Sequence, residues 1–149
     1  MTAVDVYELT TQGGASDFGR AMDTCASLPA YCLIGDLAVN CYVEPVYTLD
    51  ADIVFITAAR SDLTALLSRA GFKLEEHVHS LNAVAANSEF RIQFTTDERY
   101  QAFIPRAVAR EVLGRRVQVA SLEDVTQGKL WAYSDPTRRL SKRKKDELI

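Results

Sequence analysis

Cysteine and histidine are scarce in this chain, which contains three cysteines and two histidines in 149 residues. Cys25, Cys32 and Cys41 are an odd number with no Cys-x-x-Cys spacing, so they do not form the pattern of a disulfide framework or a zinc site. Each lies in an apolar stretch, where a thiol packs as a small hydrophobic group. We therefore expect three buried free thiols.

Long apolar runs are also missing. No run of about 18 apolar residues is present, which excludes a membrane span, and the acidic N-terminus has no signal-peptide pattern. With 48% hydrophobic residues, the chain can bury a sizeable core without disulfides or a structural metal. It has no repeat, low-complexity tract or linker, so we expect one domain over residues 1–149 in a cytoplasmic protein.

The charge is unevenly distributed. The formal net charge is −3, but six basic residues near the C-terminus supply +6, so the remainder carries −9 because −3 minus +6 is −9. We expect a basic helix at about 137–149. It predicts either a strip that binds phosphates or RNA such as tRNA, or simply a solvated helix face. The six residues are Arg138, Arg139, Lys142, Arg143, Lys144 and Lys145.

Helical and strand-like patterns alternate along the chain. A helical stripe with an internal Pro105 also runs from Tyr100 to Ala107, and the proline predicts a kink or an early break. The apolar periodicity and the turn residues predict helices over 17–28, 36–43, 61–70 and 121–133, and strands over 31–34, 50–57, 72–78, 81–86, 89–95 and 116–120.

The segment Asp50 to Thr57 contains two acids on a strand rich in β-branched residues. Asp50 and Asp52 are two residues apart, so their carboxylates point to the same face. Together with the glycine turn at Gly35, they predict a site of hard oxygen ligands for Mg²⁺ or Mn²⁺ holding a triphosphate. An Asp-x-Asp alone is more typical of the solvated face of an edge strand.

These motifs resemble the DNA polymerase beta-like nucleotidyltransferase superfamily. Its signature is matched by Leu33-Ile34-Gly35-Asp36 followed by the segment 48–54, TLDADIV. The chain looks nearest the AbiEii-type and uncharacterised bacterial branch, through the segment 119–124, VASLED, the pair Lys129-Leu130, and a basic stretch from Arg139 to Asp146. The likeness spans residues 29–146. It implies an α/β fold with a mixed sheet flanked by helices, in a toxin–antitoxin-like protein.

The resemblance also implies a reaction and a set of site residues. A nucleoside monophosphate would pass from an NTP to an acceptor on RNA or a protein, with Asp50 and Asp52 as the catalytic residues that hold two Mg²⁺ ions. Gly35, Asp36 and Lys129 would bind the nucleotide. Lys129 lies on the inward stripe of its predicted helix, where a lysine either binds phosphate or extends its stem along the core to solvent.

Two residues depart from the family pattern. Asp36 stands where the family has Gly or Ser, and a carboxylate there repels phosphate unless a metal bridges them. Gln93 stands at the position of the third acid and cannot act as a base, while Glu89 could replace it only in another strand register. A second function is therefore open: a catalytically impaired protein of this fold that binds nucleotide, nucleic acid or a partner protein.

Two histidines and three aromatic residues can each be interpreted in two ways. His77 and His79 have the spacing of metal ligands on a strand, but an exposed or hydrogen-bonded pair is the simpler interpretation. Tyr100, Trp131 and Tyr133 could stack on bases beside the basic tail, although helical spacing favours packing in the core.

Overall fold

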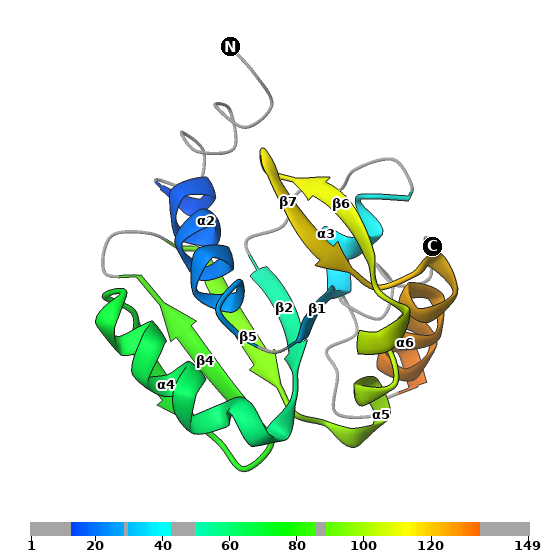
Figure 1. The fold of residues 1–149 in the computed structure, drawn as a ribbon. Helices are drawn as coiled ribbons and strands as arrows, with labels where there is room; N and C mark the ends of the chain where they lie inside the picture. The colour runs from blue at the N-terminus through cyan, green and yellow to red at the C-terminus, as the bar shows by residue number, and fades with distance from the viewer. Residues whose placement is uncertain (1–12, 29, 43–49, 86–88, 135–149) are drawn as a thin grey trace.

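The computed structural model describes residues 13–28, 30–42, 50–85 and 89–134 (Figure 1). The predicted basic helix at 137–149 lies outside these residues. None of the helices in the described ranges combines the length and apolar character needed to cross a bilayer.

A single mixed sheet of seven strands organises the described residues, in the order β3-β4-β5-β2-β1-β7-β6. The central strands β1 (Tyr31–Ile34) and β2 (Asp50–Phe55) are antiparallel, whereas β2 runs parallel to β5 (Arg91–Thr95) and β1 runs parallel to β7 (Arg115–Val119). The outer strands are β3 (Lys73–Glu76), β4 (Ser80–Val84) and β6 (Val108–Val112). The predicted α/β fold with a mixed sheet is confirmed.

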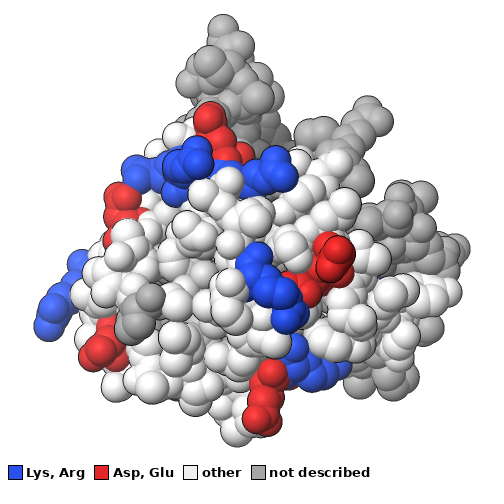
Figure 2. Space-filling view, turned by 45° about the vertical axis from the view of Figure 1, so that its right-hand side comes forward, with Lys and Arg blue, Asp and Glu red and all other residues white. Residues whose placement is uncertain are grey.

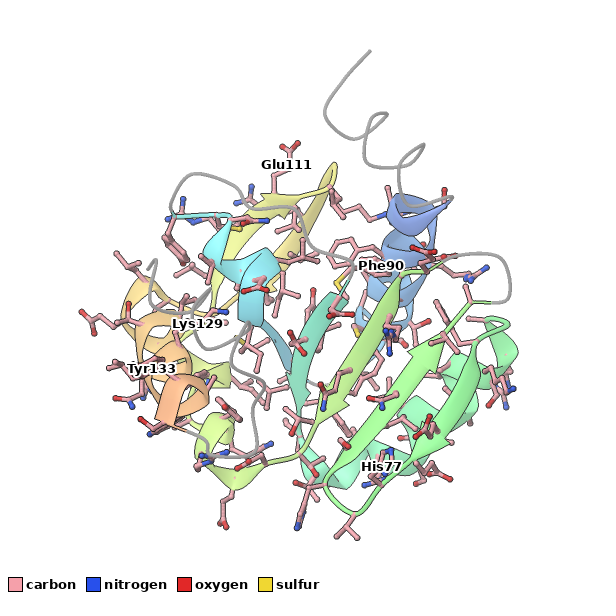
Figure 3. The ribbon with its side chains drawn as sticks, turned by 180° about the vertical axis from the view of Figure 1, so that it is seen from behind. His77, Phe90, Glu111, Lys129 and Tyr133 are labelled. Carbon is pink, nitrogen blue, oxygen red and sulfur yellow. The ribbon has the colours of Figure 1, made fainter. Side chains whose placement is uncertain are left out.

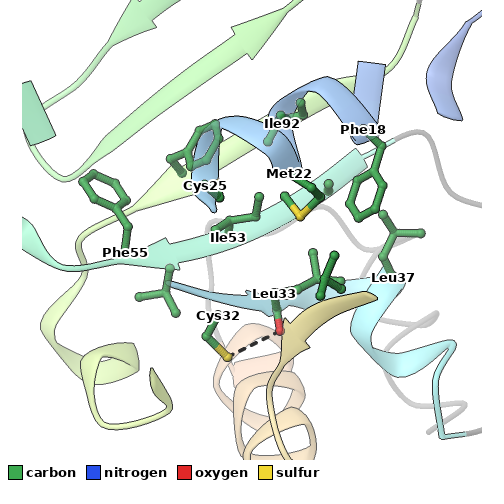
Figure 4. Packing of buried hydrophobic residues seen from close by; sticks show 14 of the residues in the cluster. Phe18, Met22, Cys25, Cys32, Leu33, Leu37, Ile53, Phe55 and Ile92 are labelled. Atoms are coloured by element: carbon green, nitrogen blue, oxygen red, sulfur yellow. Dashed lines mark hydrogen bonds between the residues drawn. The ribbon is translucent and has the colours of Figure 1, made fainter. Parts of the chain in front are cut away.

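Two helices cover one face of the sheet, α2 (Gly14–Cys25) and α4 (Arg60–Arg69) (Figure 1). The apolar stripe of α2 packs on alternate strand residues, among them Ile53 and Ile92 (Figure 4). Edge-to-face ring contacts join Phe18 to Phe90 and Phe55 to Phe94, with centroids 6.3 and 6.2 Å apart. This core holds β2 and β5 side by side, which positions the polar residues on their opposite face.

Two further helices, one short and one long, lie at the other end of the sheet. The five-residue α3 (Gly35–Val39) follows β1 directly, and α6 (Leu122–Ser134) follows β7. The Ser121 hydroxyl accepts a hydrogen bond of 3.2 Å from the Asp124 backbone N–H and so caps the N-terminus of α6. The elements α3 and α6 pack against each other beside β2 (Figure 3).

Several predicted boundaries were wrong by a few residues. Helix α2 begins at Gly14 because Gly13 alone takes the left-handed conformation, with φ of 106°, before the helix. Helix α3 ends at Val39 rather than 43, and α4 begins at Arg60 after a 3₁₀ turn, Thr57–Ala59, that ends β2 early.

The segment after β5 shows the largest difference. The predicted helical stripe over 100–107 is broken, as Pro105 indicated, into α5 (Glu98–Gln101) and a 3₁₀ turn (Ile104–Arg106). Strand β6 was not predicted, because its sequence VAREV has two adjacent charges and a largely exposed pattern. It forms a hairpin with β7 through Leu113 and Gly114, which have φ values of 48° and 81°.

The cysteines differ in exposure. Cys25 and Cys32 are fully buried, and burial raises the pKa of each thiol to about 12. Cys41 is only half-buried, which corrects the prediction of three buried thiols, although burial still raises its pKa. All three are free thiols, as predicted.

Charged side chains of both signs are mixed on the face of the molecule drawn in Figure 2. The face in Figure 2 shows small groups of basic and acidic residues next to one another, with no large area of one sign among the described residues. The basic cluster 138–145 identified in the sequence lies outside the described residues. The described part of the face in Figure 2 therefore offers no extended surface of one charge as a binding site.

Candidate functional site

A cleft of about 480 Å³ opens where the end of β1, the strands β2 and β5, and the helices α5 and α6 meet. Its volume is that of a pocket for a small molecule. All six site residues proposed from the sequence line it: Gly35, Asp36, Asp50, Asp52, Gln93 and Lys129.

The two acids of β2 project into this cleft. Asp50 and Asp52 are half-buried, whereas Ala51 between them is fully buried in the core. The alternation places both carboxylates on the cleft side of one strand. Because Ile34 pairs with Asp52 across the antiparallel β1 and β2, the turn that follows β1 lies directly beside them.

Gly35 makes this turn and approaches Asp52 closely. Its φ is +71°, a left-handed conformation that side chains rarely adopt, and an added Cβ would overlap the Asp52 carboxylate. The sequence pattern indicated a glycine turn, but only the structure shows that the glycine makes room for the second acid.

We expect Gly35→Ala to lower the free energy of unfolding by about 2 kcal/mol, since backbone strain and the displacement of Asp52 add together. Gly71→Ala is the matched control, because Gly71 has φ of +93° but no atom within 4 Å of an added Cβ. In the Gly71→Ala variant, the loss in the free energy of unfolding should come from backbone strain alone. Denaturant unfolding measures both variants, and equal losses would contradict the proposed contact with Asp52.

Lys129 and Asp36 form an ion pair at the edge of the cleft. The Lys129 ammonium donates a hydrogen bond to Asp36 Oδ1, joining α6 to α3 (Figure 3). The two side chains are only 9% and 15% exposed. The inward lysine is therefore neutralised by a carboxylate, and Asp36, whose charge would otherwise repel phosphate, has a cation beside it.

Gln93 lies next to Asp52. The parallel register of β2 and β5 pairs Asp52 with Gln93 and Asp50 with Arg91. Glu89 precedes β5 and does not line the cleft, so the different register that would have brought it beside the acids does not occur. A neutral amide occupies the position beside Asp52.

Solved structures with a similar fold include an antibiotic-resistance factor and a lincosamide antibiotic adenylyltransferase. The antibiotic-resistance factor ANT(2'')-Ia superposes with a TM-score of 0.62 at 17% identity, covering 89% of this chain and 79% of that chain. Its complex with adenylyl-2''-tobramycin gives 0.60 at 17% identity, covering 89% and 84%. The lincosamide antibiotic adenylyltransferase LnuA, bound to lincomycin, gives 0.54 at 14% identity, covering 78% and 82%.

This chain has the nucleotidyltransferase fold. The fold implied by the resemblance in the sequence is thus confirmed by the structural neighbours, while membership of the superfamily and of its AbiEii-type branch stays a prediction. No protein-family model and no curated protein matches the chain.

The acids of this nucleotidyltransferase fold suit a divalent metal bound with a substrate. Among the described residues, no group of three or more His, Cys, Asp or Glu side chains is placed to hold a metal. Mg²⁺, however, is commonly bound by one or two carboxylates together with substrate phosphates and water. Asp50 and Asp52 fit that role, and the Gln93 amide oxygen is an uncharged oxygen ligand beside them.

Two further acids line the cleft and have basic partners. Asp97 accepts hydrogen bonds from the Arg99 side chain, which lower the pKa of its carboxyl group. Asp124 accepts two hydrogen bonds of 2.9 Å from the Arg106 guanidinium. The sequence analysis did not assign these pairs to the site, because they depend on how α5 and α6 meet.

The cleft also contains residues that the sequence analysis did not select. Asn82, Arg91 and Thr95 line the wall formed by β4 and β5. Side chains alternate along β5, so Arg91 and Thr95 lie on the same face of the strand as Gln93. The strand pattern in the sequence was therefore enough to select Arg91 and Thr95 together with Gln93.

The remaining aromatic and histidine candidates have structural contacts. Trp131 stacks on Phe103 with centroids 5.8 Å apart and meets Tyr100 edge to face at 5.4 Å. These contacts fit the favoured interpretation of packing for two of the three aromatics, whereas Tyr133 is 37% exposed.

The two histidines follow β3 rather than sharing a strand. The His77 Nε2 atom lies 3.0 Å from Glu75 Oε1, which matches the simpler interpretation of a hydrogen-bonded, exposed residue.

Proposed function

We propose that this protein transfers a nucleoside monophosphate from an NTP to an acceptor, with Asp50 and Asp52 holding Mg²⁺ or Mn²⁺. The observation that carries the proposal is the projection of both carboxylates into one cleft, directly beside the Gly35 turn. The fold shared with the antibiotic adenylyltransferase LnuA, and with ANT(2'')-Ia in its complex with adenylyl-2''-tobramycin, supports it. A bound divalent ion would neutralise charge on the phosphates during transfer.

The protein's own residues would mainly position the reactants. Gly35, which lacks a side chain, leaves room for the Asp52 carboxylate, and the Lys129–Asp36 pair borders the same cleft, where the phosphates would lie. The acceptor oxygen would attack the α-phosphorus as the bond to pyrophosphate breaks. A cytoplasmic location fits a protein that uses NTPs and has three free thiols.

The acceptor is the less defined partner. Two of the structural neighbours are bound to a small antibiotic or its adenylylated form, and the cleft of about 480 Å³ suits a small molecule. RNA such as tRNA, or a protein, would need the basic segment 138–145 or another surface to bind. If the protein has an AbiEii-type, toxin–antitoxin-like role, its acceptor would be one of these macromolecules, an RNA or a protein.

Gln93 favours a second candidate function. A neutral side chain beside Asp52 cannot take a proton from a hydroxyl group, and such assistance contributes about 10² to 10⁴-fold to a rate. A protein that binds a nucleotide with metal but transfers nothing would fit this replacement.

A thermal-shift screen with ATP, GTP, CTP and UTP, each with Mg²⁺, Mn²⁺ or EDTA, tests nucleotide binding. A ligand at 100 times its Kd adds about 2.7 kcal/mol to the free energy of unfolding. We expect a metal-dependent rise in Tm of about 5 to 11 °C for at least one NTP. No shift with any nucleotide and metal would contradict both candidate functions.

Transfer itself separates the two functions. An NTP labelled at the α-phosphate, incubated with Mg²⁺ and candidate acceptors, would give a labelled product in the enzyme. A metal-dependent thermal shift without labelled product would favour the nucleotide-binding protein.

A further inference from the structure

Among the residues that the structure describes, a neutral amide rather than a base lies beside the two acids. Gln93 is paired with Asp52 across β2 and β5, and its amide does not accept a proton at neutral pH. A hydroxyl acceptor loses its proton as it attacks phosphorus, so it depends on a base at this position.

The other acids that line the cleft are poorly placed for this task. Asp36 is engaged by Lys129, and Asp124 is engaged by Arg106. Asp97 lies four residues beyond Gln93, which corresponds to about 13 Å along an extended chain. Its hydrogen bonds to Arg99 favour the charged form and weaken it as a base.

The wall beside Asp50 carries a cation. Arg91 is paired with Asp50 across the strands, is exposed, and lines the cleft. Arg99 and Lys129, the other basic residues that line it, are each paired with a carboxylate. Within the described ranges, no such ion pair involves Arg91. Its guanidinium can therefore bind an anion with two parallel hydrogen bonds.

Neutral hydrogen-bonding groups lie beside this cation. Gln93 is two residues along β5 on the same face, and Asn82 on β4 pairs with Gln93 across the strands. The wall next to the acids thus offers one positive charge and two amides. These groups suit an anionic ligand with oxygen atoms and do not suit a polycation.

We propose that the acceptor is a small molecule whose attacking oxygen is already ionised at neutral pH, a carboxylate or a phosphate, bound by Arg91 and Gln93. This inference rests on the proposed nucleotidyl transfer. The acceptor oxyanion forms a bond to the α-phosphorus, the bond from that phosphorus to pyrophosphate breaks, and pyrophosphate leaves with the electron pair. No proton has to be removed, so the reaction proceeds without an acid at position 93.

The test compares matched acceptors with the full chain, Mg²⁺ and the NTP that gives the largest thermal shift. Propionate is paired with propan-1-ol, and methyl phosphate with methanol, each with label at the α-phosphate of the NTP. We expect the anion of at least one pair to be labelled at least 10²-fold faster than its neutral partner. Hydroxylamine distinguishes the two anions, because it converts an acyl nucleotide to a hydroxamate and leaves a phosphate-linked product intact.

Three variants connect this preference to the wall. Arg91→Ala should reduce labelling of the anion at least tenfold, whereas Arg116→Ala, an exposed arginine on β7 outside the cleft, should leave it unchanged. Gln93→Glu should reduce labelling of the anion and increase labelling of the alcohol, since it supplies a base and a repelling charge.

The outcomes separate this inference from the proposed function. Faster or equal labelling of the alcohols by the natural sequence would overturn the inference and leave nucleotidyl transfer in place. An undiminished rate in Arg91→Ala would also overturn it, as would a bound nucleotide with no labelled product from either class. A chain that shows no metal-dependent thermal shift would instead contradict the proposed function itself.

Discussion

Asp50→Asn is expected to reduce nucleotidyl transfer by about 10²-fold or more, corresponding to about 2.7 kcal/mol of lost transition-state stabilisation. Asparagine keeps the shape of the side chain but removes the charge that would hold a divalent ion. Because Asp50 lines the cleft and its neighbour Ala51 carries the packing, the fold should be retained. The metal-dependent thermal shift with NTP should fall with the transfer rate.

Asp62→Asn is the matched control for this variant. Asp62 is an exposed residue in the first turn of α4, and it does not line the cleft. It makes the same change in charge and shape, so it corrects for the effect of net charge on nucleotide binding. Transfer that survives unchanged in Asp50→Asn would refute the role of this carboxylate.

Lys129→Met is expected to lower the free energy of unfolding by about 3 kcal/mol, the cost typical of removing one partner from a buried ion pair. The Asp36 carboxylate, 15% exposed, would lose its ammonium partner. For a chain of this length the loss corresponds to a decrease in Tm of about 6 to 12 °C. Thermal and denaturant unfolding measure it, with Lys73→Met on the exposed face of β3 as control.

The double variant Asp36→Asn/Lys129→Met distinguishes the ion pair from simple packing. If charge compensation is the reason for the pair, the double variant should be at least 1 kcal/mol more stable than Lys129→Met, because no buried charge remains uncompensated. Additive losses in the two single variants would show that the residues do not interact. The same pair of measurements also reports on the contact between α3 and α6.

Local patterns were enough to place the carboxylates. Side chains alternate along a strand, so Asp50 and Asp52 had to share a face once the segment formed β2. The serine cap of α6 and the break at Pro105 are local in the same sense, since each depends on residues within one turn of backbone. Boundaries were less certain, as at Gly13 and Gly14, because either glycine could have made the turn before α2.

Contacts between distant segments required the tertiary structure. The sequence placed Gln93 at the position of the third acid through a resemblance, but the pairing of Asp52 with Gln93 and of Asp50 with Arg91 depends on β5 lying beside β2. The order of strands in a sheet follows from how the core packs, and alternation along one strand does not specify its neighbour. Strand β6 was missed for a related reason, since its exposed residues give little periodic signal.

The sequence by itself determined the chemical groups of the site: two acids on one strand, a glycine turn, a glutamine and an inward lysine. Tertiary structure decided their partners. Lys129 and Asp36 are 93 residues apart, and only the packing of α6 on α3 brings the ammonium to the carboxylate. Charge interactions act over a few ångströms in space irrespective of separation along the chain, so the electrostatic character of this cleft could be read only after the chain had folded.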